Sequence, residues 1–488
     1  MSSYLKRLVA ALGAYQLADL VGKLMGVLLL PVYTGYIPPA GYGTVEAFAT
    51  AVIFSSIIVR LGMIEAFLRY HYVAADGARR DALARRAVGF LLATTTVVAI
   101  PLACFPRPLS RLLLARADPL AFELAVLGLW AFTNLELAYG LLRVEERLRA
   151  YALASLSNVA LTIGGSLALV VGLGAGADGL MGASYGATAI VLAGVWWSLR
   201  ERLLRARAPA ERLSVLLRFG LPTVPAEASV YALSVIDRVY IIHARSLALA
   251  GLYSIAIKFA GAIALLVRAF QYAWPPLAYS IADDLEAGRL YGLIATYYVL
   301  IAGWIVALLA LLGRFILRLL VHAGYYGANA ALPWLALGWA LYGMWVIFLA
   351  IAGRAKATGR NFAAALVGLA VNVGLLVALV RPFGIAGAGV ALCGAYVAML
   401  AAMHVLTRRV FAVRFEWRRL AHAALMLGAF AGGGDVLAPT RGAVGLLLRL
   451  GLWLAIPASL YATGFAHERE LQAARALLAR ARSGARAG

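Results

Sequence analysis

Charged side chains inside long apolar segments are the residues of this sequence most able to do chemistry. The stretch SVIDRVYII (234–242) places Asp237 beside Arg238 with apolar residues on both sides. A charge at the centre of a lipid bilayer costs about 2.5–3.5 kcal/mol on insertion scales. Such charges are therefore expected to face one another or a wet cavity, where a basic side chain can meet an anionic ligand.

Most of these charges fall in two predicted helical hairpins. The first hairpin carries Asp19, Lys23, Glu46, Arg60, Glu65 and Arg69. The second carries Glu227, Asp237, Arg238, Lys258 and Arg268. Glu136 and Arg449 are the main charges of this kind elsewhere in the chain.

Residues at equal distances from a hairpin turn lie at about the same depth in a membrane. Turns near residues 39–40 and 247 predict three acid–base levels, Asp19 with Arg60, Asp237 with Lys258, and Glu227 with Arg268. Neighbours on a helix point in different directions, so Asp237 and Arg238 do not serve each other. Arg238 then either extends to the membrane interface or meets an anionic ligand in a cavity.

The elements that carry these charges are membrane-spanning helices. The chain is 64% hydrophobic and 14% charged, whereas soluble domains are about half apolar and a quarter charged. A spanning helix needs about 20 mostly apolar residues, and the sequence predicts about fourteen such helices. Their ranges are 8–34, 44–69, 87–105, 119–142, 151–173, 179–198, 214–243, 250–274, 291–313, 331–353, 361–380, 386–406, 421–437 and 444–463. The predicted fold is an all-α polytopic membrane protein.

Basic residues in the loops predict the orientation of these helices. With the N-terminus in the cytoplasm, cytoplasmic segments hold 28 of the 44 Lys and Arg residues and the opposite loops hold 8. Cytoplasmic loops carry such an excess, so both termini are expected inside. The net charge of +22 then reflects topology and attraction to anionic membrane lipids, and no nucleic-acid partner is expected.

Internal similarity predicts two halves of six helices each. GLMGASYGATAI (179–190) aligns with GAGVALCGAYVA (387–398), and AGYGTVEAF (40–48) resembles AGLYSIAIKF (250–259). Parallel repeats occur in transporters whose substrate site lies between the halves. The predicted domains are an N-terminal bundle (1–212), a C-terminal bundle (213–410), two additional helices (411–465) and a basic cytoplasmic tail (466–488).

Pro222 and Pro225 lie near the start of the seventh predicted helix, and Pro31 lies near the end of the first. Proline removes hydrogen bonds and bends a helix. Bent helices at these places suit a transporter that alternates between inward-open and outward-open states. A static kink is the other interpretation.

Two short motifs suggest enzymes and are rejected. GAGADG (174–179) fits a dinucleotide-binding pattern, but no strand precedes it. GASYG (182–186) fits a nucleophile pattern, but it lies inside a predicted spanning helix, where glycines allow close helix packing. No ATP-binding motif or metal-binding cluster is visible, so no enzyme, metal or cofactor is expected.

Several motifs then resemble one family. LLPVYTGYIPPAGYG (29–43), EAFLRYHY (65–72), LRVEERLRAYAL (142–153), LRFGLPTVPAEAS (217–229), SVIDRVYII, AGLYSIAIKFA (250–260) and FQYAWPPLAYS (270–280) are similar to bacterial polysaccharide and oligosaccharide flippases. The resemblance runs from about residue 5 to 410. It implies membership of the multidrug/oligosaccharidyl-lipid/polysaccharide exporter superfamily, with two six-helix bundles around a central cavity.

The resemblance also implies a function. Such flippases move an undecaprenyl-pyrophosphate-linked oligosaccharide from the cytoplasmic to the periplasmic leaflet of the inner membrane. Their cavity is cationic and fits a pyrophosphate. The positions here that fit this role are Lys23, Arg60, Arg238, Lys258 and Arg268, with Asp19, Glu227 and Asp237 as charge partners or ion-coupling residues.

Several points stay open from the sequence. Transport could be coupled to a proton or sodium gradient, and polysaccharide polymerase or synthase components could be partners. The alternatives to an oligosaccharide flippase are a lipid II flippase, a cation-coupled multidrug exporter and a scaffold for polysaccharide synthases.

Overall fold

A computed structural model describes residues 22, 25–74, 76–205, 209, 211–355, 357 and 359–465. These residues form helices joined by short turns, and none of them lies in a strand. Eleven of the described helices are long and apolar enough to cross a membrane. The protein is therefore a multi-pass, all-α membrane protein, as the composition predicts.

The helices group by packing into two compact units. The first unit contains residues 1–254 and 320–325, and the second contains residues 255–319 and 326–488. The predicted boundary between two six-helix bundles near residue 212 was drawn from the internal sequence similarity, not from packing. It stays a prediction.

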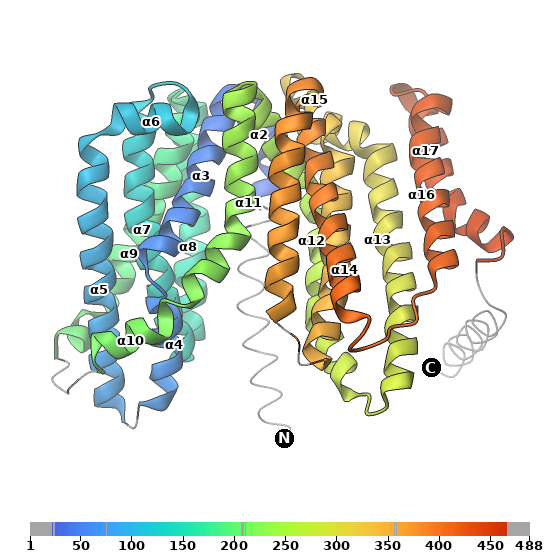
Figure 1. Cartoon of the computed structure of the whole chain (residues 1–488). Coiled ribbons are helices and arrows are strands. Elements are labelled where there is room, and N and C mark those ends of the chain that lie inside the picture. The colour runs from blue at the N-terminus through green and yellow to red at the C-terminus, as the bar shows by residue number, and fades with distance from the viewer. Residues whose placement is uncertain are drawn as a thin grey trace, which may run out of the picture. The chain divides into compact units, whose positions relative to one another are not determined.

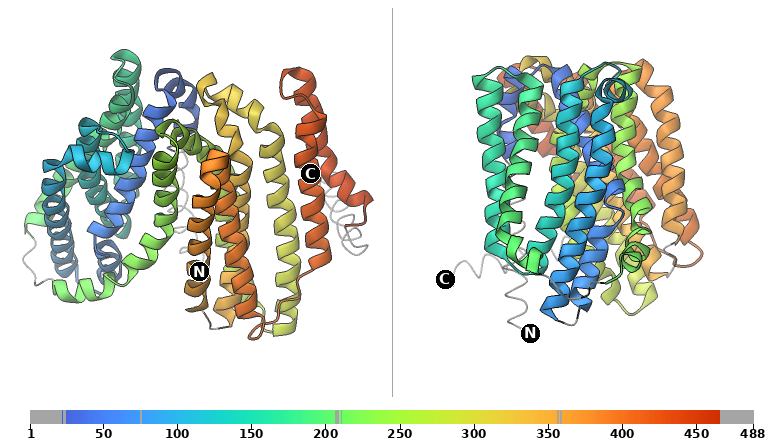
Figure 2. Two further views of the ribbon diagram at one scale, coloured as in Figure 1. Left: turned by 45° about the horizontal axis from the view of Figure 1, so that its top comes forward. Right: turned by 90° about the vertical axis from the view of Figure 1, so that its left-hand side faces the viewer.

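The first unit is built on a bundle in which α7 packs against α3, α5 and α9, and α8 packs against α9 (Figure 2). Its helices are α2 (Leu30–Tyr36), α3 (Pro39–Val59), α4 (Met63–Val73), α5 (Gly77–Cys104), α6 (Pro106–Leu114), α7 (Pro119–Val144), α8 (Leu148–Ser166), the π-helical turn η1 (Leu167–Gly172), α9 (Gly176–Arg205), α10 (Leu213–Gly220) and α11 (Thr223–Ala244). The long helix α12 (Leu247–Ser280) begins in this unit and ends in the second.

Two predicted helices are broken in the first unit (Figure 1). The prediction of one helix over 44–69 is wrong, because α3 ends at Val59 and α4 begins at Met63. Leu61 and Gly62 adopt positive φ angles of 48° and 68° between them, a conformation that α-helices do not contain. The predicted helix over 214–243 is broken between α10 and α11, next to Pro222, as the two prolines indicate.

The two similar segments over 40–48 and 250–259 lie against each other. A Cβ atom on Gly43 would lie 2.2 Å from the carbonyl oxygen of Leu247, and one on Gly251 would lie 2.0 Å from that of Pro39. Only glycine allows the starts of α3 and α12 to approach this closely. The sequence similarity between these two segments thus corresponds to a reciprocal contact between them.

The second unit consists of the rest of α12 with five further helices and most of a short 3-10 segment, whose first three residues belong to the first unit. They are α13 (Asp284–Leu320), η2 (Ala323–Ala330), α14 (Leu332–Arg354), α15 (Gly359–Thr407), α16 (Trp417–Leu437) and α17 (Gly442–Ala462). Gly384, with φ 58°, divides α15 into two arms, which correspond to the two helices predicted over 361–406. The total of fourteen spanning helices, the cytoplasmic termini and the role of the tail stay predictions.

The added pair α16 and α17 is held by a buried arginine. Arg449 has no exposed side-chain surface, and it donates two hydrogen bonds of 3.1 Å to Asp435. It also donates to the carbonyl oxygens of Leu311, Ala438 and Pro439. This intramembrane charge is satisfied within the second unit, and it has a structural role.

Candidate functional site

Arg60 lies at the end of α3, where it contacts three carboxylates from three other elements. Its guanidinium binds Glu65 of α4 at 3.3 Å and Glu136 of α7 at 2.9 Å, and it forms an ion pair with Glu227 of α11. We call these four residues the Arg60 cluster. Only 7% of the Arg60 side chain is exposed, whereas the three carboxylates are partly exposed.

The Arg60 cluster carries more negative than positive charge. With all groups ionised, one guanidinium faces three carboxylates, which leaves a local charge of −2. An excess of charge inside a membrane is costly. The cluster therefore favours an additional positive charge, such as a proton.

The break in each long helix gives the Arg60 cluster its geometry. A Cβ atom on Gly62 would lie 2.0 Å from the carbonyl oxygen of Gly220, and a Cβ atom on Gly220 would lie 2.2 Å from that of Gly62. The two breaks thus touch backbone to backbone. This contact brings α4, which carries Glu65, close to α10 and to the start of α11, which carries Glu227.

A second charge cluster lies around Arg238 on α11. The guanidinium donates to Ser254 of α12 at 3.2 Å and to Thr50 of α3, and it contacts Glu46 of α3 at 3.5 Å. We call these four residues the Arg238 cluster. Arg238 is 8% exposed, so its guanidinium is buried among polar partners rather than extended to the membrane interface.

Asp237 has a different environment from its neighbour. One carboxylate oxygen accepts a hydrogen bond of 3.0 Å from the hydroxyl of Tyr253. The other oxygen is buried and has no hydrogen-bond partner among the described residues. Asp237 and Arg238 therefore serve separate contacts, as the helical geometry predicts.

The two clusters lie at different depths along the same helices. Glu46 and Arg60 are fourteen residues apart along α3, which corresponds to about 21 Å along the axis of an α-helix. The Arg238 cluster is near the end of α3 that is predicted to be periplasmic, and the Arg60 cluster is near its predicted cytoplasmic end. The first unit thus has an outer and an inner polar layer.

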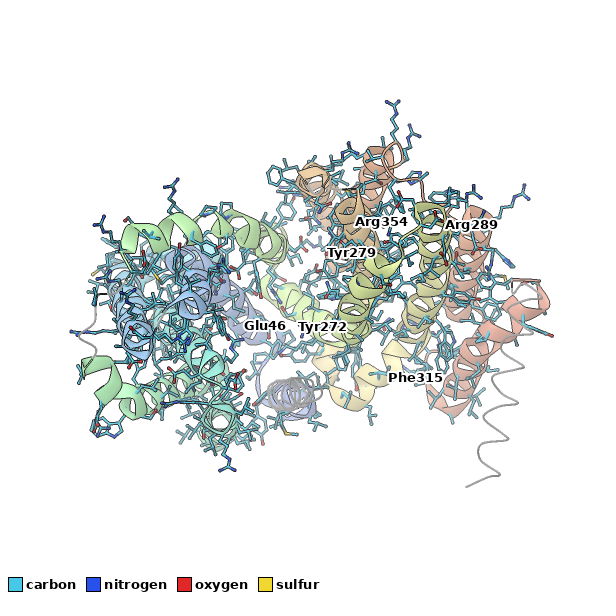
Figure 3. The ribbon with its side chains drawn as sticks, turned by 90° about the horizontal axis from the view of Figure 1, so that it is seen from below. Glu46, Tyr272, Tyr279, Arg289, Phe315 and Arg354 are labelled. Carbon is cyan, nitrogen blue, oxygen red and sulfur yellow. The ribbon has the colours of Figure 1, made fainter. Side chains whose placement is uncertain are left out.

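In the second unit, α12 presents basic and aromatic side chains on one exposed face. Lys258, Leu265, Tyr272 and Tyr279 follow one another at intervals of seven residues, and all four are exposed. Arg268 is also exposed and lies one turn from Tyr272. Tyr272 is 72% exposed, and Tyr279 lies further along α12 near Arg354 (Figure 3).

Comparison with known families agrees with this architecture. A family model described as polysaccharide biosynthesis protein matches residues 8–281. The chain belongs to this family. The matched range of the polysaccharide biosynthesis protein family includes both charge clusters as well as Lys258 and Arg268. A search of curated protein sequences finds no match.

Solved structures with a similar fold include a flippase and multidrug transporters. The lipid II flippase MurJ in an inward closed conformation is 13% identical, with a TM-score of 0.67, over 93% of this chain and 99% of that chain. An inward-facing multidrug resistance MATE family transporter of the MOP superfamily is 18% identical, with a TM-score of 0.62, over 84% of this chain and 95% of that one. An outward-facing MATE family transporter of the same superfamily is 15% identical, with a TM-score of 0.52, over 87% and 94%. At these identities the likeness shows the fold.

The structure brings together some of the predicted site residues. Arg60 and Glu227 meet in the inner layer, a pair that the hairpin levels did not predict. Glu136, which lies outside both charged hairpins of the sequence, is the third acid of this cluster. A glutamate in the middle of an apolar span was the available signal, but its partners come from other helices and cannot be identified from spacing.

The other predicted site residues and pairings stay predictions. Asp19, Lys23 and the tail over 466–488 lie outside the described residues. Pairing of Asp237 with Lys258, and of Glu227 with Arg268, would join residues of the first unit to residues of the second, and it stays a prediction. Among the described residues no group of three His, Cys, Asp or Glu side chains is placed to hold a metal ion.

Proposed function

We propose that this protein is a flippase that moves an undecaprenyl-pyrophosphate-linked oligosaccharide from the cytoplasmic to the periplasmic leaflet of the inner membrane. The exposed basic face of α12 carries this proposal most directly. Lys258 and Arg268 stand on an otherwise apolar spanning helix, where charged side chains mark a substrate path. A pyrophosphate is an anionic ligand that lysine and arginine bind well.

Membership of the polysaccharide biosynthesis protein family supports a role in the export of a glycan. The fold shared with flippases and exporters supports transport rather than catalysis, so we propose that the protein is not an enzyme. Anionic membrane lipids, which its basic loops attract, and polysaccharide polymerase or synthase components are proposed partners.

The four described cationic candidates then have different roles. Arg60 and Arg238 are buried against carboxylates and hydroxyls, so an entering pyrophosphate would have to displace those partners. Lys258 and Arg268 are exposed, so the head group can reach their side chains. We assign first contact with the pyrophosphate to Lys258 and Arg268. Arg60 and Arg238 would bind it only when their present partners release them.

The Arg60 cluster supports coupling to a proton or sodium gradient. Its surplus of two carboxylates favours an additional positive charge, such as a proton. The cluster joins α3, α4, α7 and α11 at the two helix breaks, so a change in its charge can alter how these helices pack. If dissipation of both gradients leaves the rate and extent of transport in proteoliposomes unchanged, this coupling is excluded.

A deletion strain tests the proposed function in the cell. Polyprenyl-pyrophosphate-linked oligosaccharides are extracted and analysed by mass spectrometry, and surface polymer is measured in parallel. We expect a complete lipid-linked repeat unit to accumulate while the surface polymer is lost, and a plasmid copy should reverse both changes. Normal lipid-linked pools with intact polymer would contradict the proposal.

A lipid II flippase is the second candidate, and the similarity in fold to MurJ favours it. Lipid II and a lipid-linked oligosaccharide share the polyprenyl-pyrophosphate group, so Lys258 and Arg268 suit both. The deletion strain separates them, because loss of lipid II transport blocks cell-wall synthesis and prevents growth. Viable deletion cells with normal peptidoglycan would remove this candidate.

A cation-coupled multidrug exporter is the third candidate. The surplus of acidic groups in the Arg60 cluster favours it, since cationic drugs bind to such sites. A deletion strain with altered tolerance to cationic drugs and normal lipid-linked glycans would replace the flippase proposal with this one.

A further inference from the structure

Three aromatic side chains and one amide form a group in the second unit. None of these four residues belongs to the Arg60 cluster or the Arg238 cluster. The amide nitrogen of Gln271 on α12 donates a hydrogen bond of 3.0 Å to the hydroxyl of Tyr342 on α14. The ring of Tyr342 lies 5.8 Å from that of Trp339 and 5.9 Å from that of Tyr396 on α15. We call these four residues the aromatic–amide group.

The aromatic–amide group lies deep within membrane-spanning helices. Tyr342 is ten residues from the start of α14, about 15 Å along a helix whose 23 residues extend about 35 Å. Tyr396 is likewise near the middle of the second arm of α15, which begins after Gly384. The polar atoms of the group are thus near mid-depth in the bilayer.

All four side chains of this group are partly exposed. The hydrogen bond to Tyr342 uses only one of the two donors of the Gln271 amide, and amide groups that face lipid at this depth without further partners are costly. A face that contacts a hydrated, polar ligand avoids this cost. Arg268, which lies three residues before Gln271, shares that side of α12.

The chemistry of the group matches a sugar. A pyranose ring presents a face of C–H bonds, which packs on the electron-rich face of an aromatic ring, and hydroxyl groups at its edge, which pair with amides and phenols. The group offers three aromatic rings from α14 and α15 and one amide from α12. The aromatic surface and the amide together suit a neutral sugar better than a phosphate.

We propose that the aromatic–amide group binds the first sugars of the lipid-linked glycan, next to the pyrophosphate held by Arg268. This inference rests on the proposed flippase function and deepens it by assigning sugar recognition to Gln271, Trp339, Tyr342 and Tyr396. The pyrophosphate provides affinity that all such lipids share, and the aromatic–amide group distinguishes lipids that carry a sugar.

The test compares two lipids that differ only in the sugar. The probes are undecaprenyl pyrophosphate and undecaprenyl pyrophosphate bearing one N-acetylglucosamine, and binding is measured by competition against radiolabelled undecaprenyl pyrophosphate on the full-length protein in nanodiscs. We expect the wild type to bind the sugar-bearing lipid about five- to tenfold more tightly, within the range of one or two aromatic contacts. Trp339→Leu should remove this preference and change the Kd of the sugar-free lipid by less than twofold.

Two further variants separate recognition from folding. Tyr342→Phe keeps the ring but removes the hydroxyl that accepts from Gln271, and it should lose part of the preference while it keeps the wild-type Tm. Trp197→Leu is the matched control, because Trp197 is 69% exposed on α9 in the first unit, and it should retain the full preference.

The outcomes distinguish this inference from the function on which it rests. Equal binding of both lipids by the wild type, or an equal loss for both lipids in Trp339→Leu, would overturn the role of the aromatic–amide group and leave a pyrophosphate-binding flippase. Failure of the wild type to bind either lipid would contradict the proposed function itself.

Discussion

Gly62 and Gly220 lie backbone against backbone, so that a Cβ atom on either glycine would come within 2.2 Å of the other's carbonyl oxygen. This contact joins the break between α3 and α4 to the break between α10 and α11. Each of these broken helices contributes to both charge clusters. The helices that meet at this contact therefore carry residues of both the inner and the outer polar layer of the first unit.

Replacement of Gly220 by alanine tests this contact. The added methyl group has no space, so the two breaks must separate, and overpacking of this kind typically costs about 1–3 kcal/mol. We expect Gly220→Ala to lower the Tm of the purified protein and to reduce transport more than tenfold. Gly89→Ala is the control, because a Cβ atom on Gly89 of α5 would meet no atom within 4 Å, and its Tm should equal or exceed that of the wild type. A wild-type Tm and transport rate in Gly220→Ala would show that the contact is dispensable.

A further prediction concerns the balance between the guanidinium and the three carboxylates of the Arg60 cluster. Arg60→Gln leaves three carboxylates without their common partner, which costs less than the figure of about 3–5 kcal/mol typical of a fully buried pair, because these carboxylates are partly exposed. We expect a marked fall in Tm and loss of transport. A second change, Glu227→Gln, removes one of the uncompensated charges and should restore part of the Tm in the double variant.

The control for this pair is Arg69→Gln, a change of the same kind at an exposed residue of α4, which should alter the Tm by less than one degree. If the losses of Tm in Arg60→Gln and Glu227→Gln simply add in the double variant, the two residues are not coupled, and the account of the cluster is wrong.

The next prediction concerns the shape of the guanidinium of Arg238, tested by a change to lysine, which keeps the positive charge. Its guanidinium uses three nitrogens for three partners, Ser254, Thr50 and Glu46. Lysine keeps the charge but has a single nitrogen, so it cannot reach all three partners. We expect Arg238→Lys to reduce transport at least tenfold in proteoliposomes, whereas Thr50→Ser, which keeps a hydroxyl, should retain most of it. Full transport by Arg238→Lys would show that only the charge matters.

Arg354 makes a prediction about the second unit. It donates hydrogen bonds to Asp284 and to the carbonyl oxygens of Ala278, Ile281 and Ala282, at the end of α12. Arg354→Ala removes these bonds and should lower the Tm by at least about 3 °C while it exposes residues 281–283 to limited proteolysis. Arg289→Ala, at an exposed position on α13, serves as the control. Equal stability and equal cleavage in both variants would contradict this role.

The sequence predicted most of the architecture because spanning helices need long apolar segments. The break at Pro222 and the two arms of α15 on either side of Gly384 correspond to features of the sequence. The break at Leu61–Gly62 was not predicted, since no proline marks it. It depends on the contact of Gly62 with Gly220, which is remote in sequence.

The candidate site was predicted in part. Charges inside the spanning helices could be identified because each is costly there, and Arg60, Glu227 and Arg238 all lie in polar layers, whereas their functional roles stay predictions. Their partners could not be assigned from hairpin depth, because helix breaks shift the levels and helix α7 brings Glu136 from outside both hairpins. The contribution of Tyr253, Thr50 and Ser254 was also missed, since hydroxyl groups are common in spanning helices and carry no distinct signal.

The most direct test of the central claim is a flipping assay with purified protein in liposomes. Undecaprenyl-pyrophosphate-linked oligosaccharide is placed in both leaflets, and its accessibility to an externally added lectin is followed over time. The account predicts that liposomes with the wild-type protein expose nearly all of the lipid-linked glycan, and that Lys258→Ala/Arg268→Ala slows this exposure at least tenfold. If liposomes with the wild-type protein expose no more glycan than protein-free liposomes, the flippase assignment is contradicted.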